Sequence, residues 1–345
     1  MHNKNGKVAL WGNQYIFNMA HTLNDYLREV ETLFKEERFI FDPKELYEPI
    51  DYTLRLGGKR IRPTLLLAAN ALFGGREEEV RGAALGIETF HNFTLLHDDL
   101  MDRSPLRRGQ PTVYTKWGDN TAVLSGDTMF ALAWRYFLRQ PTPRLREILN
   151  CFNETAIEVC EGQQKDMNFE KRAIGDVSLE EYMDMIRQKT AVLLAGALKI
   201  GALYAGAPDG EIEKLYAFGL HLGLAFQLQD DLLDGYGDTA VFGKKTGQDI
   251  RDLKKNYLVL RALQLSSRQQ ADELTRLFGD AALDEDERVV RVMALYDAIG
   301  LKPSVEEAIG EEFRAAGECL DRIDADEALK APLRELTATL VGRKK

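Results

Sequence analysis

The chain has 345 residues, of which 45% are hydrophobic and 29% charged, and a formal net charge of −10 at pH 7. This composition supports a large hydrophobic core and argues against intrinsic disorder, while the negative charge argues against a nucleic-acid-binding surface. No apolar stretch reaches bilayer length, no signal-peptide core is present, and the three cysteines show no metal-ligand spacing, so we expect a soluble, cytoplasmic protein with free thiols.

Apolar residues recur at helical spacing along most of the chain. Residues 1–18 are polar and contain glycines, so we expect a leader that is at least partly disordered, followed by a single domain over residues 19–345. The expected helices begin at residue 19, follow Pro43 as far as Gly57, run from Pro63 to Leu72 and from Glu77 to about residue 100, and then cover 122–138, 144–169, 179–204 and 211–233. Alternation typical of strands is nearly absent, so the sequence predicts an all-α bundle.

Two copies of one acidic pattern, DDLMD at 98–102 and DDLLD at 230–234, end two of these expected helices. On a helix the first and fifth residues of the pattern share a face, and the second lies about 100° round the axis. Carboxylates grouped in this way repel one another and oppose the helix dipole, so they need a cation. Mg²⁺ suits an all-oxygen ligand set and usually completes its shell with water and phosphate oxygens. The pattern therefore predicts a two-sided magnesium site for a diphosphate.

An acidic protein that binds a diphosphate needs local positive charge. Two basic segments meet this expectation, one at 59–62 (KRIR) and one formed by Arg107 and Arg108.

Seven motifs occur in the order found in the trans-isoprenyl diphosphate synthases, the polyprenyl synthetase family, and the chain resembles its short-chain members, the geranylgeranyl and farnesyl diphosphate synthases. The motifs are GGKRIRP at 57–63, HNFTLLHDDLMD at 91–102, RRG at 107–109, GDNTAVLSGD at 118–127, KT at 189–190, FQLQDDLLD at 226–234 and GKKTGQDIRDLKKN at 243–256. The resemblance implies long, mostly antiparallel helices around a central cavity, with the aspartate motifs facing each other at its mouth, and a homodimer.

The resemblance also implies a magnesium-dependent prenyltransferase. Such an enzyme condenses isopentenyl diphosphate with dimethylallyl, geranyl or farnesyl diphosphate by ionisation, condensation and elimination. Ionising an allylic C–O bond requires stabilisation of negative charge by metal and cationic side chains, so no nucleophilic serine or cysteine is needed.

Residue roles follow from the matching motif positions. Asp98, Asp102 and Asp230 are expected as direct Mg²⁺ ligands, with Asp99 and Asp234 supporting them through hydrogen bonds or water. Three further sets complete the expected site: Asp98, Asp102, Lys189, Asp230 and Lys244 as catalytic residues; Arg107, Lys189, Thr190, Gln227, Lys244 and Lys254 for the allylic diphosphate; and Lys59, Arg62, His91 and Arg108 for isopentenyl diphosphate, whose charge is met without metal. Gln163 and Asp166 also match a family pattern near the allylic site, although a polar helix face explains them nearly as well.

Product length is set in this family by bulky residues just before the first aspartate motif. Phe93 lies five residues before Asp98, about 7.5 Å deeper along a helix, and its neighbour Thr94 is small. We therefore expect Phe93 to stop the growing chain without a second aromatic residue. Geranylgeranyl diphosphate is the favoured product and farnesyl diphosphate the alternative. The plainer interpretation is that Phe93 merely packs between helices.

Three other functions stay open. A class I terpene cyclase also uses DDxxD, but usually carries an Asn/Ser/Glu metal motif on its second side, where this chain has DDLLD. A non-catalytic synthase subunit tends to lose aspartates, and all six are present here. A helical scaffold with chance acidic patches would not bind diphosphates in a magnesium-dependent manner.

Overall fold

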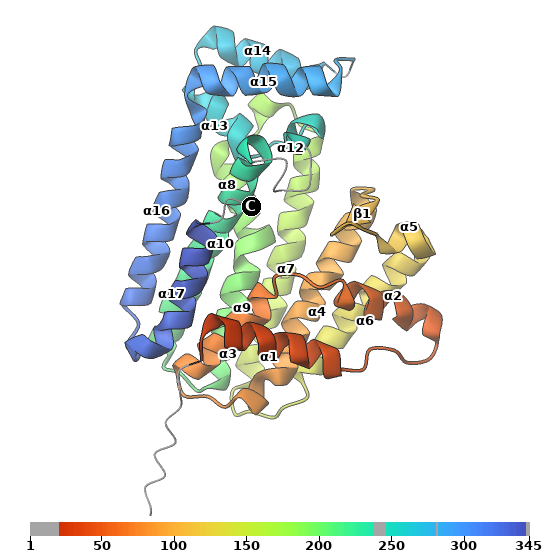
Figure 1. Cartoon of the computed structure of the whole chain (residues 1–345), viewed down its shortest axis with the longest axis vertical. Coiled ribbons are helices and arrows are strands. Elements are labelled where there is room, and N and C mark those ends of the chain that lie inside the picture. Colours follow the sequence, from red (N-terminus) through yellow and green to blue (C-terminus); the bar gives the residue numbers. More distant parts are fainter. Residues whose placement is uncertain (1–20, 238–245, 281, 343–345) are drawn as a thin grey trace, which may run out of the picture.

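The computed structural model describes residues 21–237, 246–280 and 282–342, and it confirms the predicted all-α fold (Figure 1). The leader predicted at 1–18 and Lys244 lie outside the described residues. One short antiparallel hairpin pairs β1 (Leu106–Arg107) with β2 (Gln110–Pro111). No helix in the described part of the chain is long and apolar enough to cross a membrane.

The helices of the first half are α1 (Leu23–Glu36), α2 (Lys44–Arg55), α3 (Ile61–Leu72), α4 (Glu77–Met101), α5 (Val113–Trp117), α6 (Asp119–Phe137) and α7 (Leu145–Glu170). A 3-10 turn, η1 (Ile174–Asp176), leads into α8 (Leu179–Ile186), the π turn η2 (Arg187–Ala191) and α9 (Val192–Tyr204). The remaining helices are α10 (Asp209–Tyr236), α12 (Gln248–Arg251), α13 (Tyr257–Leu265), α14 (Arg268–Gly279), α15 (Glu285–Ile299), α16 (Leu301–Asp321) and α17 (Glu327–Val341).

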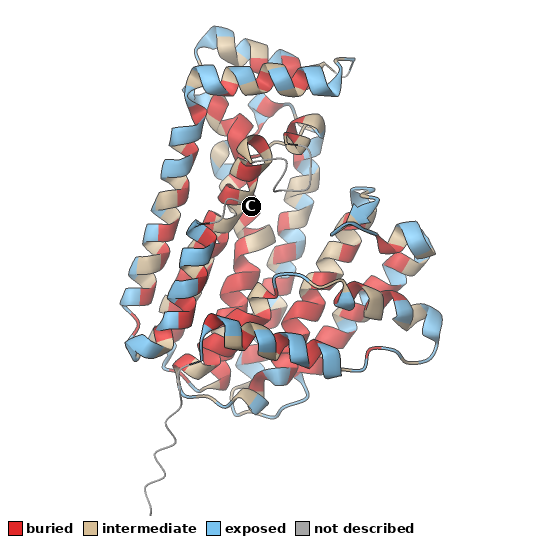
Figure 2. Cartoon of the chain, in the orientation of Figure 1, coloured by how far each residue is buried: buried red, intermediate tan, exposed pale blue. Residues whose placement is uncertain are grey.

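Helix α9 lies at the centre of the bundle. All of its residues except Lys199 are buried, and α3, α7 and α10 pack around it. On one side α4 packs against α3 and α6; on the other, α16 packs along α10, while α14 and α15 cross one end of the molecule (Figure 1). Figure 2 shows that burial is concentrated on the inward faces of these helices. An all-round apolar sequence is what a fully enclosed helix needs.

Several helix boundaries differ from those expected, among them the start of α6, which lies at Asp119 rather than at residue 122. Helix α3 begins at Ile61 rather than at Pro63, which lies instead in the first turn. Proline is tolerated there because the N–H groups of a first turn lack helical partners in any case. Helix α10 continues to Tyr236, so the second aspartate motif occupies its last turns rather than its end.

The long helix expected over 179–204 is interrupted. Between α8 and α9 the chain makes the π turn η2, in which the Val192 N–H donates to the Arg187 carbonyl five residues earlier. A π turn inserts one extra residue and often marks a functional position. Here it contains Lys189 and Thr190, two of the predicted site residues.

Candidate active site

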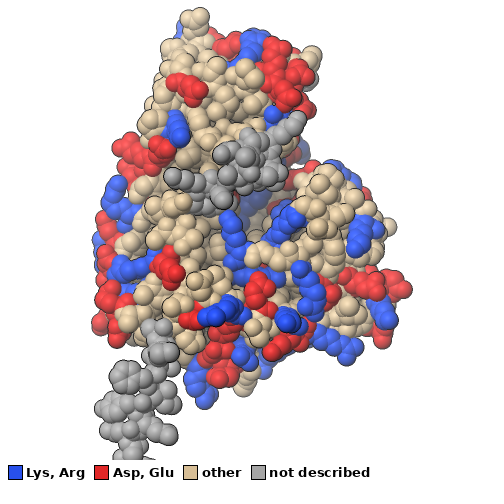
Figure 3. Space-filling model, in the orientation of Figure 1, with Lys and Arg blue, Asp and Glu red and all other residues tan. Residues whose placement is uncertain are grey.

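A cavity of about 830 Å³ lies between the start of α3, α4, the β1 strand, α7, η2 and α10. Lys and Arg side chains surround a hollow on the face of the molecule seen in Figure 3. The predicted residues that line the cavity are Lys59, Arg62, His91, Phe93, Thr94, Asp98, Arg107, Arg108, Gln163, Lys189, Thr190, Gln227 and Asp230. Asp99, Asp102, Asp166, Asp234 and Lys254 do not line it.

One wall of the cavity is positively charged. Arg62 Nη1 lies 3.1 Å from His91 Nε2. Because a guanidinium group has no acceptor, Nε2 must accept and the His91 proton must sit on Nδ1. Burial and the charge of Arg62 hold the pKa of His91 well below its usual value, so the ring is neutral.

Arg62 forms no ion pair with an acidic side chain among the described residues, although the charge of Glu88 acts on it. The buried Nε of Arg62 has no hydrogen-bond partner in the described part of the chain, and burial lowers the pKa of Arg62 to about 10. A buried cation without full compensation is costly, so this wall is suited to receiving an anion.

The chain places Arg62 at the cavity by turning its neighbour Arg60 into the core. Arg60 has a positive φ of 47°. Its Nη1 lies 3.0 Å from Glu88, and its guanidinium lies 4.3 Å from the Phe34 ring centroid. Arg60 still borders the cavity, and Lys59 and Arg62, on either side, line it as well.

Arg108 reaches the same wall over a pair of glycines. Its Nη1 donates to the Gly57 carbonyl, and a Cβ placed on Gly58, where φ is +135°, would lie only 2.6 Å from Arg108 Nη2. The glycines of the GGKRIRP motif thus leave room for the guanidinium and supply a backbone shape that other residues avoid.

The carboxylates of the first aspartate motif are not equivalent. Asp98 lines the cavity, and burial raises its pKa to about 6 although Lys189 opposes the shift. Asp102 is exposed. Asp99 is buried, and Arg107 holds it with Nε at 2.7 Å from Oδ2 and Nη2 at 2.7 Å from Oδ1. The middle aspartate therefore anchors Arg107.

The second motif repeats this division. Asp230 lines the cavity, whereas Asp231 is buried and accepts hydrogen bonds from the Tyr182 hydroxyl and, at 3.1 Å each, from the Tyr257 N–H and Gln227 Nε2. Burial, and then Asp249, raise the pKa of Asp231 to about 8.

Asp234 binds the backbone at the start of α12. Its Oδ2 accepts from the Asp249 N–H at 3.0 Å and its carbonyl from the Gly247 N–H at 2.7 Å.

The π turn adds cationic and hydroxyl groups to the cavity. Lys189 Nζ lies 2.6 Å from Asp166 Oδ2. Burial alone would lower the pKa of Lys189, but the carboxylates of Asp166 and Asp98 outweigh it and the pKa is raised. Thr190 Oγ1 donates to Gln227 Oε1 at 3.0 Å. Lys189 is thus a fixed cation close to Asp98.

The carboxylates fit a magnesium ion that is shared with a substrate. Within residues 21–237, 246–280 and 282–342, no three acidic, histidine or cysteine side chains converge into a ready-made metal site. Mg²⁺ is usually held by one or two carboxylates together with substrate phosphates. Asp98 on α4 and Asp230 on α10 offer such oxygen donors from two walls, whereas Asp102, the residue after α4, is exposed and does not line the cavity.

Asp249 in α12 was not among the site residues predicted from the sequence. It accepts from Asn256 Nδ2 at 2.8 Å, and its carbonyl accepts from the Lys254 N–H at 2.8 Å. Lys254 Nζ lies 3.0 Å from Glu170 Oε1. Burial raises the pKa of Asp249. Its position in the GQDIRDLKKN motif could have indicated it. Asp249 binds both Lys254 and Asn256 of the same motif.

An aromatic cluster borders the cavity at Phe93. Phe93 borders the cavity and stacks on Phe130 of α6, with ring centroids 5.4 Å apart, and the His97 ring meets it edge-on at 4.8 Å. Phe90 and Phe152 continue the cluster behind Phe130, at 5.7 and 6.4 Å. Phe93 is therefore both a cavity residue and a packed one.

The cavity therefore combines charged groups with an apolar part bordered by Phe93, Val159 and Leu193, which suits a ligand with an anionic head and an apolar chain. Residues 43–296 match the polyprenyl synthetase family. The geranylgeranyl diphosphate synthase of Methanosarcina mazei is 40% identical over 284 residues, covering 80% of this chain and 85% of the relative. The geranylfarnesyl diphosphate synthase of Natronomonas pharaonis is 37% identical over 332 residues, covering 91% and 94%.

A crystal structure of a geranylgeranyl pyrophosphate synthase superposes with a TM-score of 0.86 at 39% identity, covering 94% of this chain and all of the other. The chain belongs to the polyprenyl synthetase family. This membership confirms the predicted family, fold and prenyltransferase class.

Proposed function

We propose that this protein condenses isopentenyl diphosphate with an allylic diphosphate and that its main product is geranylgeranyl diphosphate. The observation that supports this most is the basic wall, where the buried Nε of Arg62 has no hydrogen-bond partner among the described residues and His91 is neutral. This wall binds the diphosphate of isopentenyl diphosphate through Lys59, Arg62, His91 and Arg108, and it needs no metal. Planar guanidinium groups suit phosphate because they donate two parallel hydrogen bonds.

The allylic diphosphate binds beside the carboxylates. Asp98, Asp102 and Asp230 would hold Mg²⁺ for it, with Asp99 and Asp234 in support. Arg107, Lys189, Thr190, Gln227 and Lys254 would complete the site together with Lys244, which lies outside the described residues. Bound Mg²⁺ would offset the negative charge that develops on the leaving diphosphate. Because Lys189 is already a fixed cation next to Asp98, it adds to that stabilisation without reorganisation.

The remaining chemistry needs no side-chain nucleophile. Breaking the allylic C–O bond leaves an allylic cation and diphosphate, the isopentenyl double bond supplies the electrons for the new C–C bond, and the departed diphosphate takes up the proton that is lost. The apolar part of the cavity, lined by Phe93, Val159 and Leu193, keeps water from the cation.

Product length follows from where that apolar part ends. Phe93 with Phe130 behind it forms the end of the cavity, and Thr94 beside Phe93 adds no second ring. Relatives named for geranylgeranyl and for geranylfarnesyl diphosphate both resemble this chain, which supports a product longer than farnesyl diphosphate. A terpene cyclase is disfavoured because it has no use for a second, metal-free diphosphate wall.

We also propose that the enzyme acts in the cytoplasm as a homodimer. The support for a dimer is an apolar exposed surface on and just after α6, where Leu124 and Leu138 keep 58% and 55% of their surface exposed. Light scattering after gel filtration should give twice the chain mass of 39.0 kDa, and a single-chain mass would refute the dimer.

Two matched variants test the proposed division of substrates. Arg62→Met should raise the KM for isopentenyl diphosphate by ~10- to 100-fold, since a hydrogen bond to a charged group contributes about 1.5–3 kcal/mol, and should leave the KM for the allylic substrate unchanged. Lys189→Met should instead lower kcat and weaken the allylic substrate. If both variants affected both substrates equally, the two-site assignment would be wrong.

A further inference from the structure

We propose that Arg187, with Glu158 and Asp184, is a positioning device that fixes the π turn η2 and thereby presents Lys189 and Thr190 to the allylic diphosphate. This inference rests on the proposed function, because Arg187, Glu158 and Asp184 would affect the allylic substrate only through Lys189 and Thr190.

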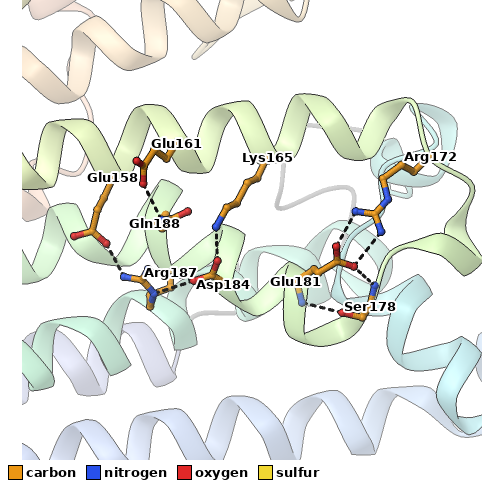
Figure 4. A network of polar contacts seen from close by, with 9 residues as sticks. All are labelled: Glu158, Glu161, Lys165, Arg172, Ser178, Glu181, Asp184, Arg187 and Gln188. Carbon is orange, nitrogen blue, oxygen red and sulfur yellow. Dashed lines mark hydrogen bonds and ion pairs between the residues drawn. The ribbon is translucent and has the colours of Figure 1, made fainter.

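A ladder of polar contacts joins α7 to the α8–η2 segment (Figure 4). Three side chains on one face of α7 each meet a partner opposite. Arg187 Nη1 lies 2.7 Å from Glu158 Oε2, Gln188 Nε2 donates to Glu161 Oε2 at 3.1 Å, and Lys165 pairs with Asp184. Arg187 also bridges back to Asp184, with Nη2 at 3.2 Å from Oδ1. Two of these contacts, those of Arg187 and Gln188, are made by residues of the π turn itself.

The backbones are in direct contact at the same place. A Cβ on Gly162 of α7 would lie 2.4 Å from the Lys189 nitrogen, and a Cβ on Gly223 of α10 would lie 2.4 Å from the Ala191 Cα. The π turn is thus seated between two glycines. Any shift of the turn along the helix would replace this close fit with a clash or a gap.

The π turn inserts one extra residue between α8 and α9. These two helices alone do not determine where in the segment that residue lies. Helix α9 is locked by burial, and α8 by its Ser178–Glu181 capping box and the buried Tyr182–Asp231 hydrogen bond. These fixed ends do not specify at which residue the insertion lies, so its position depends on the contacts of the turn itself, which are the two glycines and the polar contacts with α7. Moving it by one position turns the intervening side chains by about 100° around the axis.

The Arg187 contacts hold the insertion at the observed position. With the insertion at Arg187–Ala191, Lys189 and Thr190 line the cavity, while Arg187 and Gln188 face α7. The ion pairs of Arg187 and Asp184 are partly exposed, so they add little to global stability. Their value lies in setting which side chains reach the diphosphate.

The test compares Arg187→Met with Arg187→Lys and with Arg172→Met. Arg172 forms a similar partly exposed pair with Glu181 at the far end of the same network, away from the π turn, and serves as the matched control. Arg187→Met should lower kcat by ~10- to 100-fold, as expected for a misplaced cation, with the KM for isopentenyl diphosphate unchanged and the melting temperature lowered by less than about 4 °C. Arg187→Lys should restore part of the rate, and Arg172→Met should behave like the wild type.

A double-mutant cycle shows whether Arg187 acts through Lys189. Binding of inorganic pyrophosphate with Mg²⁺ is measured by calorimetry for the wild type, Arg187→Met, Lys189→Met and the double variant. If Arg187 acts through Lys189, it adds almost nothing once Lys189 is removed. Additive losses, or a kcat for Arg187→Met within about twofold of the wild type, would overturn the proposal. A wild-type protein that binds pyrophosphate but makes no prenyl product would instead refute the proposed function.

Discussion

Replacing Phe93 by alanine should lengthen the product. The Phe93 ring borders the cavity, and Phe130 lies directly behind it at a centroid distance of 5.4 Å. Removing the ring opens space as far as Phe130 but leaves the rest of the aromatic cluster in place. We therefore expect growth by about one five-carbon unit, from geranylgeranyl to geranylfarnesyl diphosphate, and not an open-ended series.

The size of the effect follows from apolar burial. Each buried CH₂ group contributes about 0.8 kcal/mol, so a five-carbon unit that finds room gains up to about 4 kcal/mol. In the wild type the Phe93 ring occupies this space, so the next five-carbon unit does not gain this burial energy. Forcing the unit against Phe93 would in addition cost the free energy of overpacking. Recovering only half of the burial energy, about 2 kcal/mol, changes the ratio of elongation to release by ~30-fold.

Products from the wild type, Phe93→Ala and Thr94→Phe are to be sized by chromatography after dephosphorylation. Thr94→Phe is the matched control, because it adds a second ring next to Phe93 and should shorten the product to farnesyl diphosphate. Phe93→Leu covers the case in which the alanine variant fails to fold, since Phe93 packs on three rings. An unchanged product distribution in all three variants would refute Phe93 as the end of the cavity.

Two further predictions concern stability and the seat of the π turn. Burial and a hydrogen bond to Glu77 raise the pKa of Glu29 to about 9, well above its unfolded value of about 4.3. The folded state therefore holds the extra proton between these values, and stability falls as the pH rises through that window. Glu29→Gln should raise the melting temperature at pH 8 but not at pH 4, and equal melting curves at pH 8 would contradict this. Gly162→Ala should cost about 1–3 kcal/mol by overpacking against Lys189. Gly310→Ala in α16, where a Cβ meets nothing within 4 Å, should gain up to about 1 kcal/mol. Chemical denaturation measures both, and equal stabilities would show that the close approach at Gly162 is relaxed at no cost.

Much of the helical framework could be predicted because local sequence determines it. Glycine pairs at 57–58 and 74–75 follow α2 and α3, and the 3.6-residue apolar pattern marks α4, α7 and α10. Many of the residues in the motifs also line the cavity, but Asp102, Asp234 and Lys254 do not. These features depend on spacing along the chain, which a sequence displays directly.

The different roles within each aspartate motif could not be predicted from spacing. Asp99 is held outside the cavity lining by its ion pair with Arg107. Arg107 lies on the β1–β2 hairpin, so this pair depends on how the hairpin packs against α4. Asp231 is held by Tyr182, a residue 49 positions away. Pairings of this kind depend on tertiary packing, so a pattern of three carboxylates does not reveal which of them are free to bind metal.

The π turn was hidden for a different reason. A one-residue insertion is detectable only where it disturbs a pattern, and 192–204 is apolar on nearly every face. Its signals were the small residues opposite, Gly162 and Gly223, whose meaning appears only when three helices are brought together.

The central claim is that two diphosphates bind at separate walls of one cavity and are joined there. Its most direct test is to incubate the wild-type protein with isopentenyl diphosphate, Mg²⁺ and, in separate reactions, dimethylallyl, geranyl or farnesyl diphosphate, and to size the products. The account predicts geranylgeranyl diphosphate from each starter, and none when the metal is chelated. Release of cyclic or simply hydrolysed products that contain no isopentenyl carbon would contradict it.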